Sequence, residues 1–263
     1  MGNRIKTTVI TVVFNEVDRI RNTIDSVMEQ DYGNIEYIIK DGGSTDGTLD
    51  LIRSAASSHD NIRFVSGPDK GIYDAMNIGL SMATGDVVQF LNAGDRFAAP
   101  DVIYRAARAM EDTGSDIVFG DVMYENSDGT VEVRRYPQYC AKKVYYLTGD
   151  CINHQCMFVK KSLFERTNFD TAFRICADRE WMLRIGAYTP HLHMTALGFT
   201  VAVYPLDGAS VVNKERYRTE AGMCIRKYLP LGYPIYAIFE FARSHSRLAG
   251  ILHGLYRRLF MSR

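Results

Sequence analysis

Several common features are missing from this sequence, and each absence excludes a class of protein. The 31 basic and 31 acidic residues cancel over 263 positions, and hydrophobic residues make up 46% of the chain, which argues against disorder. The five cysteines are odd in number and show no Cys-x-x-Cys spacing, which argues against a disulfide framework or a zinc site and favours a reducing cytoplasm. No segment reaches the roughly 20 apolar residues of a transmembrane helix. The apolar run at residues 9–14 is short, and we expect a first strand there rather than a signal peptide.

The sequence also lacks a Gly-x-Gly-x-x-Gly motif after its first predicted strand, where it reads Val13-Phe14-Asn15-Glu16. This argues against a dinucleotide-dependent oxidoreductase, although strand and helix signals alternate along residues 1–115. Apolar residues at helical spacing separate strand signals at residues 7–14, 35–40, 62–66, 87–91 and 117–120. This alternation predicts an α/β fold with a Rossmann-like, mainly parallel central sheet flanked by helices.

From residue 121 the pattern changes to shorter strands at 131–136 and 156–159, followed by a helix at about 178–187. We expect this part to extend the same sheet, so that residues 1–213 form one domain with two halves, 1–115 and 116–213. Residues 214–263 carry ten Lys and Arg against three Glu, a net charge of +7. The other 213 residues are net acidic, which argues against nucleic acid as the partner.

The end of this basic region has the pattern of an amphipathic helix. Its apolar residues fall on one helical face, and they are Leu248, Ile251, Leu252, Leu255 and Leu259. Such a helix either docks on the domain or lies in an anionic membrane surface. The excess positive charge favours the membrane, because each Lys or Arg near an anionic leaflet contributes about 1 kcal/mol.

Two polar loops follow predicted strands. Residues 41–48 read Asp-Gly-Gly-Ser-Thr-Asp-Gly-Thr, and residues 91–95 read Leu-Asn-Ala-Gly-Asp. Both belong at the carboxyl edge of a parallel sheet, where open α/β sheets bind ligands. Glycines permit close backbone approach, and aspartates accept hydrogen bonds from a base or ribose or hold a divalent metal. Together the loops indicate a nucleotide-sugar site.

Individual residues near these loops allow two interpretations each. Asp41 could contact a base or complete an Asx-turn, and Asp95 could hold a cation on a diphosphate or serve only its turn. Lys70 lies in a turn that opens a helix and could face phosphate or solvent. Asp178 could act as a base or only favour a helix dipole. His154 could be catalytic or a hydrogen-bonded core residue.

The ordered set of motifs resembles the family 2 inverting glycosyltransferases, most closely the bacterial exopolysaccharide subgroup that includes the colanic-acid type. The resemblance covers about residues 5–213. It is carried by residues 14–16, 41–48, 69–77, 83–86 and 91–95, by Ala177-Asp178 and by Leu183-Arg184. It implies a GT-A fold with a C-terminal helical extension. Residues 1–115 are then the nucleotide-sugar-binding half, and residues 116–213 the acceptor and catalytic half.

The resemblance also implies roles for single residues. Asp41 contacts the base, Asp95 holds a Mn or Mg ion, and Asp178 is the catalytic base, with Arg184 and His154 in the catalytic set. The donor-binding set is Phe14, Asn15, Glu16, Asp41, Lys70, Asp74, Asn92 and Asp95. The sequence departs from the family pattern in two loops, and both departures remove carboxylates. Gly42 stands where the family often has a second Asp, and Asn92 and Gly94 stand in place of two aspartates of the family's Asp-x-Asp-Asp motif.

The expected activity is transfer of a sugar from a UDP- or GDP-linked donor to a hydroxyl of a glycan or polyprenyl-linked acceptor in surface polysaccharide synthesis. The alternative is a nucleotide-sugar-binding subunit with weak catalysis, which the substitutions at Asn92 and Gly94 motivate. The expected location is cytoplasmic and peripheral, at the inner face of the plasma membrane.

Overall fold

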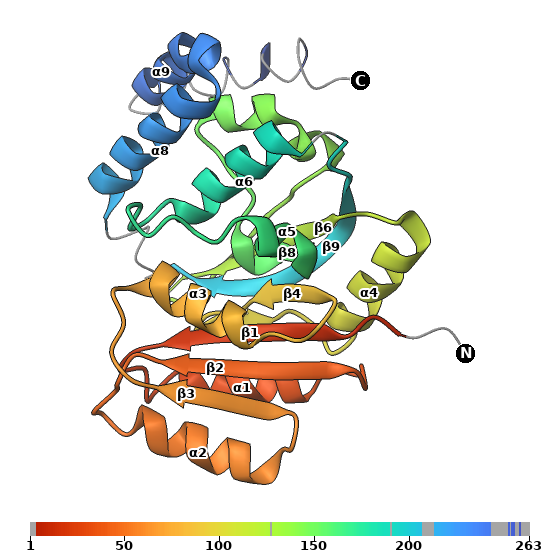
Figure 1. The fold of residues 1–263 in the computed structure, drawn as a ribbon. Coiled ribbons are helices and arrows are strands. Elements are labelled where there is room, and N and C mark those ends of the chain that lie inside the picture. The colour runs from red at the N-terminus through yellow and green to blue at the C-terminus, as the bar shows by residue number, and fades with distance from the viewer. Residues whose placement is uncertain are drawn as a thin grey trace.

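The structure is a computed structural model that describes residues 4–126, 128–189, 191–206 and 213–242, together with 252, 254, 255 and 258. A single twisted sheet, flanked by helices, runs through the molecule (Figure 1). Its strand order is β3-β2-β1-β4-β8-β6-β9-β5, with β7 paired to β6. The strands are β1 (Thr7–Val13), β2 (Ile35–Asp41), β3 (Ile62–Ser66), β4 (Val87–Phe90), β5 (Arg96–Phe97), β6 (Ile117–Glu125), β7 (Val131–Arg134), β8 (Met157–Lys160) and β9 (Met194–Pro205).

The first half of the sheet is parallel, as the alternation of strand and helix signals predicts. Strands β3, β2, β1 and β4 pair in parallel, and the connecting helices are α1 (Ile20–Met28), α2 (Thr48–Ser58) and α3 (Ile72–Met82). Every residue of β1 is buried, which is expected of a parallel strand covered on both faces. Helix α3 packs closely on β1 at Gly79, where an added Cβ would lie 2.6 Å from Ile10 Cγ2. The pairing of Val13 with Asp41 ends β1 and β2 at the same level, so the loops that follow them are neighbours.

The second half of the sheet is mixed. Strand β8 runs antiparallel to β4 and β6, whereas β9 runs parallel to β6 and antiparallel to β5. The chain reaches β8 through the 3₁₀ turns η1 (Gln138–Ala141), η2 (Lys143–Thr148) and η3 (His154–Cys156) rather than through a crossover helix. The α/β class and the GT-A-like arrangement are thus confirmed, and only the first half of the sheet is wholly parallel.

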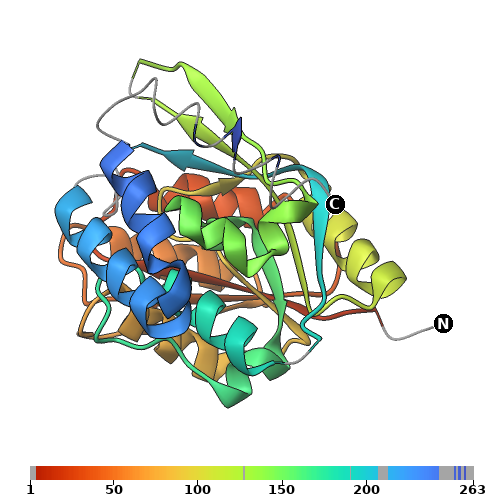
Figure 2. The same ribbon diagram turned by 90° about the horizontal axis from the view of Figure 1, so that it is seen from above.

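The remaining helices are α4 (Val102–Thr113), α5 (Lys161–Arg166), α6 (Ala177–Tyr188), α8 (Lys214–Tyr228) and α9 (Tyr233–Ala242), with the 3₁₀ turn η4 (Pro230–Gly232). Helix α8 packs against α6, and α9 packs against η2 and α8. Seen from above, α8 and α9 lie on one side of the molecule and α4 on the other (Figure 2). The part of the chain covered by the structure contains no helix long and apolar enough to cross a bilayer.

The structure describes residues 214–242 of the C-terminal region and a few residues beyond them. Residues 214–242 form helices that belong to the packed structure of the domain. Most of the predicted amphipathic helix, including Leu248, Ile251 and Leu259, lies outside the described residues. Of that helix, Leu252 is partly buried against the core and Leu255 is 50% exposed.

Strand β2 carries a buried carboxylate, Glu36, that joins three segments of the parallel half. It accepts hydrogen bonds from Thr8 Oγ1 at 2.7 Å and from the Thr84 backbone N–H at 2.8 Å, and Arg63 approaches to 3.0 Å. Burial opposes ionisation, but the hydrogen bonds from Thr84 and Thr8 and the charge of Lys6 outweigh it and lower the pKa of Glu36 to about 2.

We predict that Glu36→Gln lowers the free energy of unfolding by about 2–3 kcal/mol at pH 7, because the variant loses a carboxylate that is ionised more readily in the folded state. The contribution is present above the ordinary pKa of 4.5 and is lost as the pH falls toward about 2. Denaturant titrations at several pH values measure it, with the exposed Glu29→Gln as control. An equal difference between wild type and variant at pH 7 and pH 2.5 would contradict this role.

Candidate functional site

The candidate site lies at the carboxyl ends of β1, β2 and β4, as the two polar loops predict. The loops after these strands face the first turn of α6 and the turn η3, which come from the second half of the chain. Hydrogen bonds join the two halves directly, from Asn92 to His154 and from His154 to Asp178.

The loop after β2 is organised around the carboxylate of Asp41, which is fully buried. It accepts hydrogen bonds from the backbone N–H groups of Gly43 and Ser44 and from the hydroxyls of Ser44 and Ser66, both at 2.5 Å. Burial opposes ionisation, but these donors outweigh it and hold the pKa of Asp41 below its usual value. The Asx-turn interpretation therefore describes the loop itself, and contact with a base stays a prediction.

The end of β1 is tied to this loop and exposes an aromatic ring. Asn15 has φ +53° and accepts a hydrogen bond from the Thr45 N–H at 2.9 Å. Phe14 is 60% exposed. Its ring lies against Gly42, where an added Cβ would come within 3.0 Å of the ring. Glu16 forms an ion pair with Arg19 at 2.6 Å. An exposed ring beside a glycine offers a flat apolar face for a base.

The turn that opens α3 holds the next two predicted residues. The Asp74 carboxylate accepts the backbone N–H of Lys70 at 2.9 Å, and the Lys70 side chain is exposed. Lys40 also belongs to this part of the site, and the sequence did not predict it. It is buried, and its Nζ lies 3.0 Å from Asp69 Oδ2 and 2.7 Å from the Gly67 carbonyl oxygen. Lys40 thus locks the turn before α3 to β2. The available signal was a lysine at the end of the strand signal 35–40, directly before Asp41.

The loop after β4 contains two oxygen atoms suited to a hard cation. Asp95 is 3% exposed, and burial raises its pKa to about 7 despite the charge of His154 nearby. Within the described residues, neither Asp95 Oδ2 nor Asn92 Oδ1 has a hydrogen-bond partner. Among the residues that the structure describes, no three or more Asp, Glu, His or Cys side chains lie close enough together to hold a metal ion. The two orphan oxygens therefore fit a Mg or Mn ion that takes its other ligands from water and a diphosphate.

His154 connects this loop to the first turn of α6. Its Nε2 lies 3.0 Å from Asn92 Nδ2, and its Nδ1 lies 3.1 Å from Asp178 Oδ2. The Asn92 amide N–H points at Nε2, and Nδ1 donates to the Asp178 carboxylate. The same orientation of the amide leaves Asn92 Oδ1 as one of the two oxygens without a hydrogen-bond partner in the loop after β4.

Asp178 is held by several donors at the start of α6. Besides His154, its Oδ1 lies 3.0 Å from Tyr73 Oη and accepts the Arg179 backbone N–H at 2.8 Å. Burial opposes ionisation, but the hydrogen bond and charge of His154 outweigh it and keep the pKa of Asp178 below its usual value. The carboxylate is therefore charged at neutral pH and keeps 15% of its surface exposed. A general base requires both properties.

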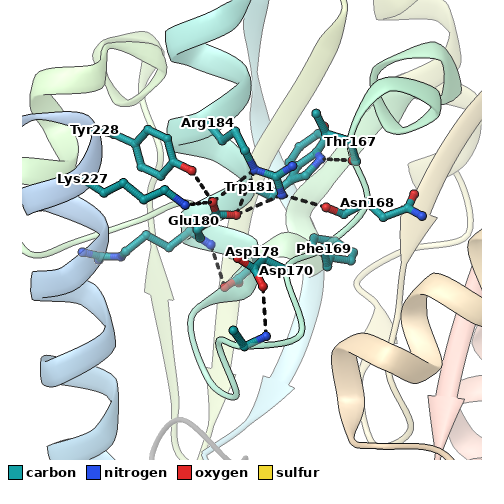
Figure 3. A network of polar contacts seen from close by, with 12 residues as sticks. Thr167, Asn168, Phe169, Asp170, Asp178, Glu180, Trp181, Arg184, Lys227 and Tyr228 are labelled. Atoms are coloured by element: carbon teal, nitrogen blue, oxygen red, sulfur yellow. Dashed lines mark hydrogen bonds and ion pairs between the residues drawn. The ribbon is translucent and has the colours of Figure 1, made fainter.

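Arg184 is not brought to Asp178. Six residues further along α6, its guanidinium binds Glu180 at 3.0 Å and donates to the Asn168 carbonyl at 2.7 Å. Glu180 is fully buried and also receives the Tyr228 hydroxyl and, at 3.5 Å, Lys227 of α8 (Figure 3). In this structure Arg184 therefore stabilises the junction of α6 and α8, and any catalytic role for it stays a prediction.

The fold and the site define an α/β protein with a cluster of polar side chains at the carboxyl ends of its parallel strands, and comparisons with known proteins give its family. The sequence profile described as "Glycosyl transferase family 2" matches residues 8–167. The chain therefore belongs to glycosyl transferase family 2.

Two similar sequences are described as glycosyltransferases. An uncharacterized glycosyltransferase of Mycobacterium tuberculosis is 35% identical over 179 residues, which is 67% of each chain. A PGL/p-HBAD biosynthesis glycosyltransferase of Mycobacterium bovis is 30% identical over 198 residues, 73% of this chain and 75% of the relative. Two solved structures share the fold at low identity.

The first is Staphylococcus aureus TarS 1–349 in complex with UDP-GlcNAc, with a TM-score of 0.67 at 17% identity, covering 93% of this chain and 74% of that one. The second is the mannosyltransferase PcManGT of Pyrobaculum calidifontis with GDP-Man and Mn2+. Its TM-score is 0.68 at 19% identity, covering 98% of this chain and 76% of that one.

We predict that Asp95→Ala abolishes the dependence of nucleotide binding on Mn, because it removes the one orphan carboxylate oxygen in the loop after β4. Calorimetric titration of UDP and GDP with and without Mn measures the effect. The exposed Asp18→Ala, in the loop after β1, is the control and should keep the wild-type dependence. Retention of full Mn dependence by the Asp95 variant would rule out this ligand.

Proposed function

We propose that this protein is a metal-dependent inverting glycosyltransferase that moves a sugar from a UDP- or GDP-linked donor to a hydroxyl of a glycan or lipid-linked oligosaccharide. The observation that carries the proposal is the Asp178 carboxylate, which is held charged by His154 and joined through it to the Asn92–Asp95 loop. The proposed pathway is surface polysaccharide synthesis.

The donor is placed along the carboxyl edge of the parallel strands. Phe14 and Asp41 are assigned to the base; the exposed ring of Phe14 supports this, and Asp41 shapes the loop beside the ring. The diphosphate is assigned to the N-terminal turn of α3 with Lys70, where backbone N–H groups and the helix dipole favour an anion. Structures of related fold hold UDP-GlcNAc in one case and GDP-Man in the other, which supports a nucleotide-sugar donor of either kind.

The proposed reaction is a single displacement at the anomeric carbon. Asp178 takes the proton of the acceptor hydroxyl as that oxygen attacks, the bond from the anomeric carbon to the diphosphate oxygen breaks, and the nucleoside diphosphate leaves with the electron pair. Attack from the opposite face inverts the configuration. His154 and Tyr73 hold Asp178 in place and keep it ionised until the proton arrives. A divalent cation held by Asp95 and Asn92 would neutralise the charge of the departing diphosphate.

We predict that Asp178→Asn lowers turnover by at least about a hundredfold while donor affinity changes little, because the amide cannot accept the proton. Nucleotide release measures turnover, and calorimetry with the donor measures affinity. The exposed Asp60→Asn, in the turn before β3, is a control. A normal rate in the Asp178 variant contradicts the base assignment. A wild-type rate that does not exceed the background measured without protein favours the alternative of a weakly catalytic binding subunit.

We also propose that the protein binds an anionic membrane surface, where a polyprenyl-linked acceptor would be presented. The outward face of α9 and the preceding turn support this, because their exposed residues are apolar: Leu231, Pro234, Ala237, Ile238 and Phe241. Basic side chains are exposed on the adjoining helix α8 at Lys214, Arg216, Arg218, Arg226 and Lys227. An apolar face beside exposed basic groups is the pattern of a helix that lies in the interface.

We predict that the full chain co-sediments with vesicles of phosphatidylglycerol and phosphatidylcholine, that salt weakens this binding, and that deletion of residues 230–263 abolishes it. Because that deletion removes α9, which packs on η2, the double variant Ile238→Ser and Phe241→Ser is the cleaner test and should also reduce binding. If the truncated protein and the double variant bind the vesicles as well as wild type does, the exposed face of α9 contacts another partner.

A further inference from the structure

Helix α8 reaches the segment that leads into α6. Glu220 of α8 is 6% exposed, and its carboxylate accepts three consecutive backbone N–H groups of that segment. The distances are 3.0 Å from Arg174 N to Oε1, 2.8 Å from Ile175 N to Oε2 and 3.0 Å from Cys176 N to Oε2. Successive N–H groups that converge in this way form an anion-binding concavity. Here the anion is a side chain from an element 44 residues away.

The opposite side of the same segment is held by α3 and the turn before it. Tyr73 Oη lies 2.8 Å from the Ile175 carbonyl oxygen and 3.0 Å from Asp178 Oδ1. Arg174 donates to the Lys70 carbonyl. The segment is therefore fixed between α3 and α8 immediately before Asp178. Its last residue, Cys176, accepts the first hydrogen bond of α6 from the Glu180 N–H at 2.9 Å.

We infer that Glu220 is a positioning residue for the reaction: by binding the N–H groups of Arg174, Ile175 and Cys176, it sets the first turn of α6 and so places the Asp178 carboxylate. This inference rests on the proposed function, in which Asp178 is the base. It makes α8 part of the catalytic apparatus. Without Glu220 the three N–H groups lose their acceptor, and the turn that carries Asp178 is free to shift.

Displacement of a catalytic group by about 1 Å costs on the order of a hundredfold in rate. We therefore expect Glu220→Ala to lower kcat by about 10- to 100-fold while the KM for the donor changes less than about threefold, since the Lys70 turn, whose carbonyl Arg174 contacts, is also held by Asp69 and Asp74. Glu220→Gln should be intermediate, because it keeps one acceptor oxygen but turns an N–H toward the same backbone donors. The exposed Glu215→Gln on α8 is the matched control and should equal wild type.

The test is a double-mutant cycle of Glu220→Ala and Asp178→Asn, with nucleotide release from UDP- and GDP-sugars measured well below the unfolding temperature of every variant. If Glu220 acts through Asp178, adding Glu220→Ala to the Asp178→Asn protein lowers turnover by less than about twofold. A full, additive loss would show that Glu220 acts elsewhere. A wild-type kcat in Glu220→Ala with only a lower melting temperature would reduce its role to stability.

The two proposals fail separately in this experiment. If Asp178→Asn keeps the wild-type rate, the base assignment fails and Glu220 has no base to position. If Asp178→Asn loses activity and Glu220→Ala does not, the positioning role alone is wrong. Hydrogen exchange gives a readout that needs no substrate: in Glu220→Ala the amides of Arg174, Ile175 and Cys176 should lose protection. Unchanged protection there would contradict the hydrogen bonds on which the inference depends.

Discussion

The proposed displacement depends on the carboxylate of Asp178, which is largely buried and still stays ionised. Burial of Asp178 favours its neutral form, which could not accept a proton from an acceptor hydroxyl. His154, Tyr73 and the Arg179 N–H surround the carboxylate with donors, and the balance leaves the pKa of Asp178 below its usual value. Because His154 also accepts from Asn92, the same hydrogen-bond chain links the proposed base to the loop assigned to the metal.

The fold places these groups by bringing distant elements to one edge of the sheet. Strands β1, β2 and β4 are parallel; β1 and β2 end level at Val13 and Asp41, and β4 ends at Phe90 opposite Ile10, so their loops gather at the edge proposed for the donor. The proposed base comes from the first turn of α6, and the segment before that turn is held by α3 and α8 from opposite sides. A site built at such a junction can keep an unpaired oxygen at Asp95, because the surrounding hydrogen bonds fix the loop without it.

The sequence predicts the parallel half of the sheet well, because strand periodicity and glycine-rich turns are local signals. It also predicts that the loops at Asp41 and Asp95 meet at one edge. The link between Asn92 and His154 spans 62 residues, and that between Cys176 and Glu220 spans 44, so neither leaves a local pattern. Arg184 shows both cases: its pairing with Glu180 is a local i,i+4 contact within α6, whereas the approach of Lys227 to the same carboxylate follows from the packing of α8.

The central claim is a single displacement in which Asp178 deprotonates the acceptor. A single displacement must invert the anomeric centre, so the most direct measurement is the anomeric configuration of the product by proton NMR, starting from an α-linked nucleotide sugar. The account predicts a β-linked product from wild type and no such product above background from Asp178→Asn. An α-linked product, or a β-linked product formed equally well without Asp178, would contradict it.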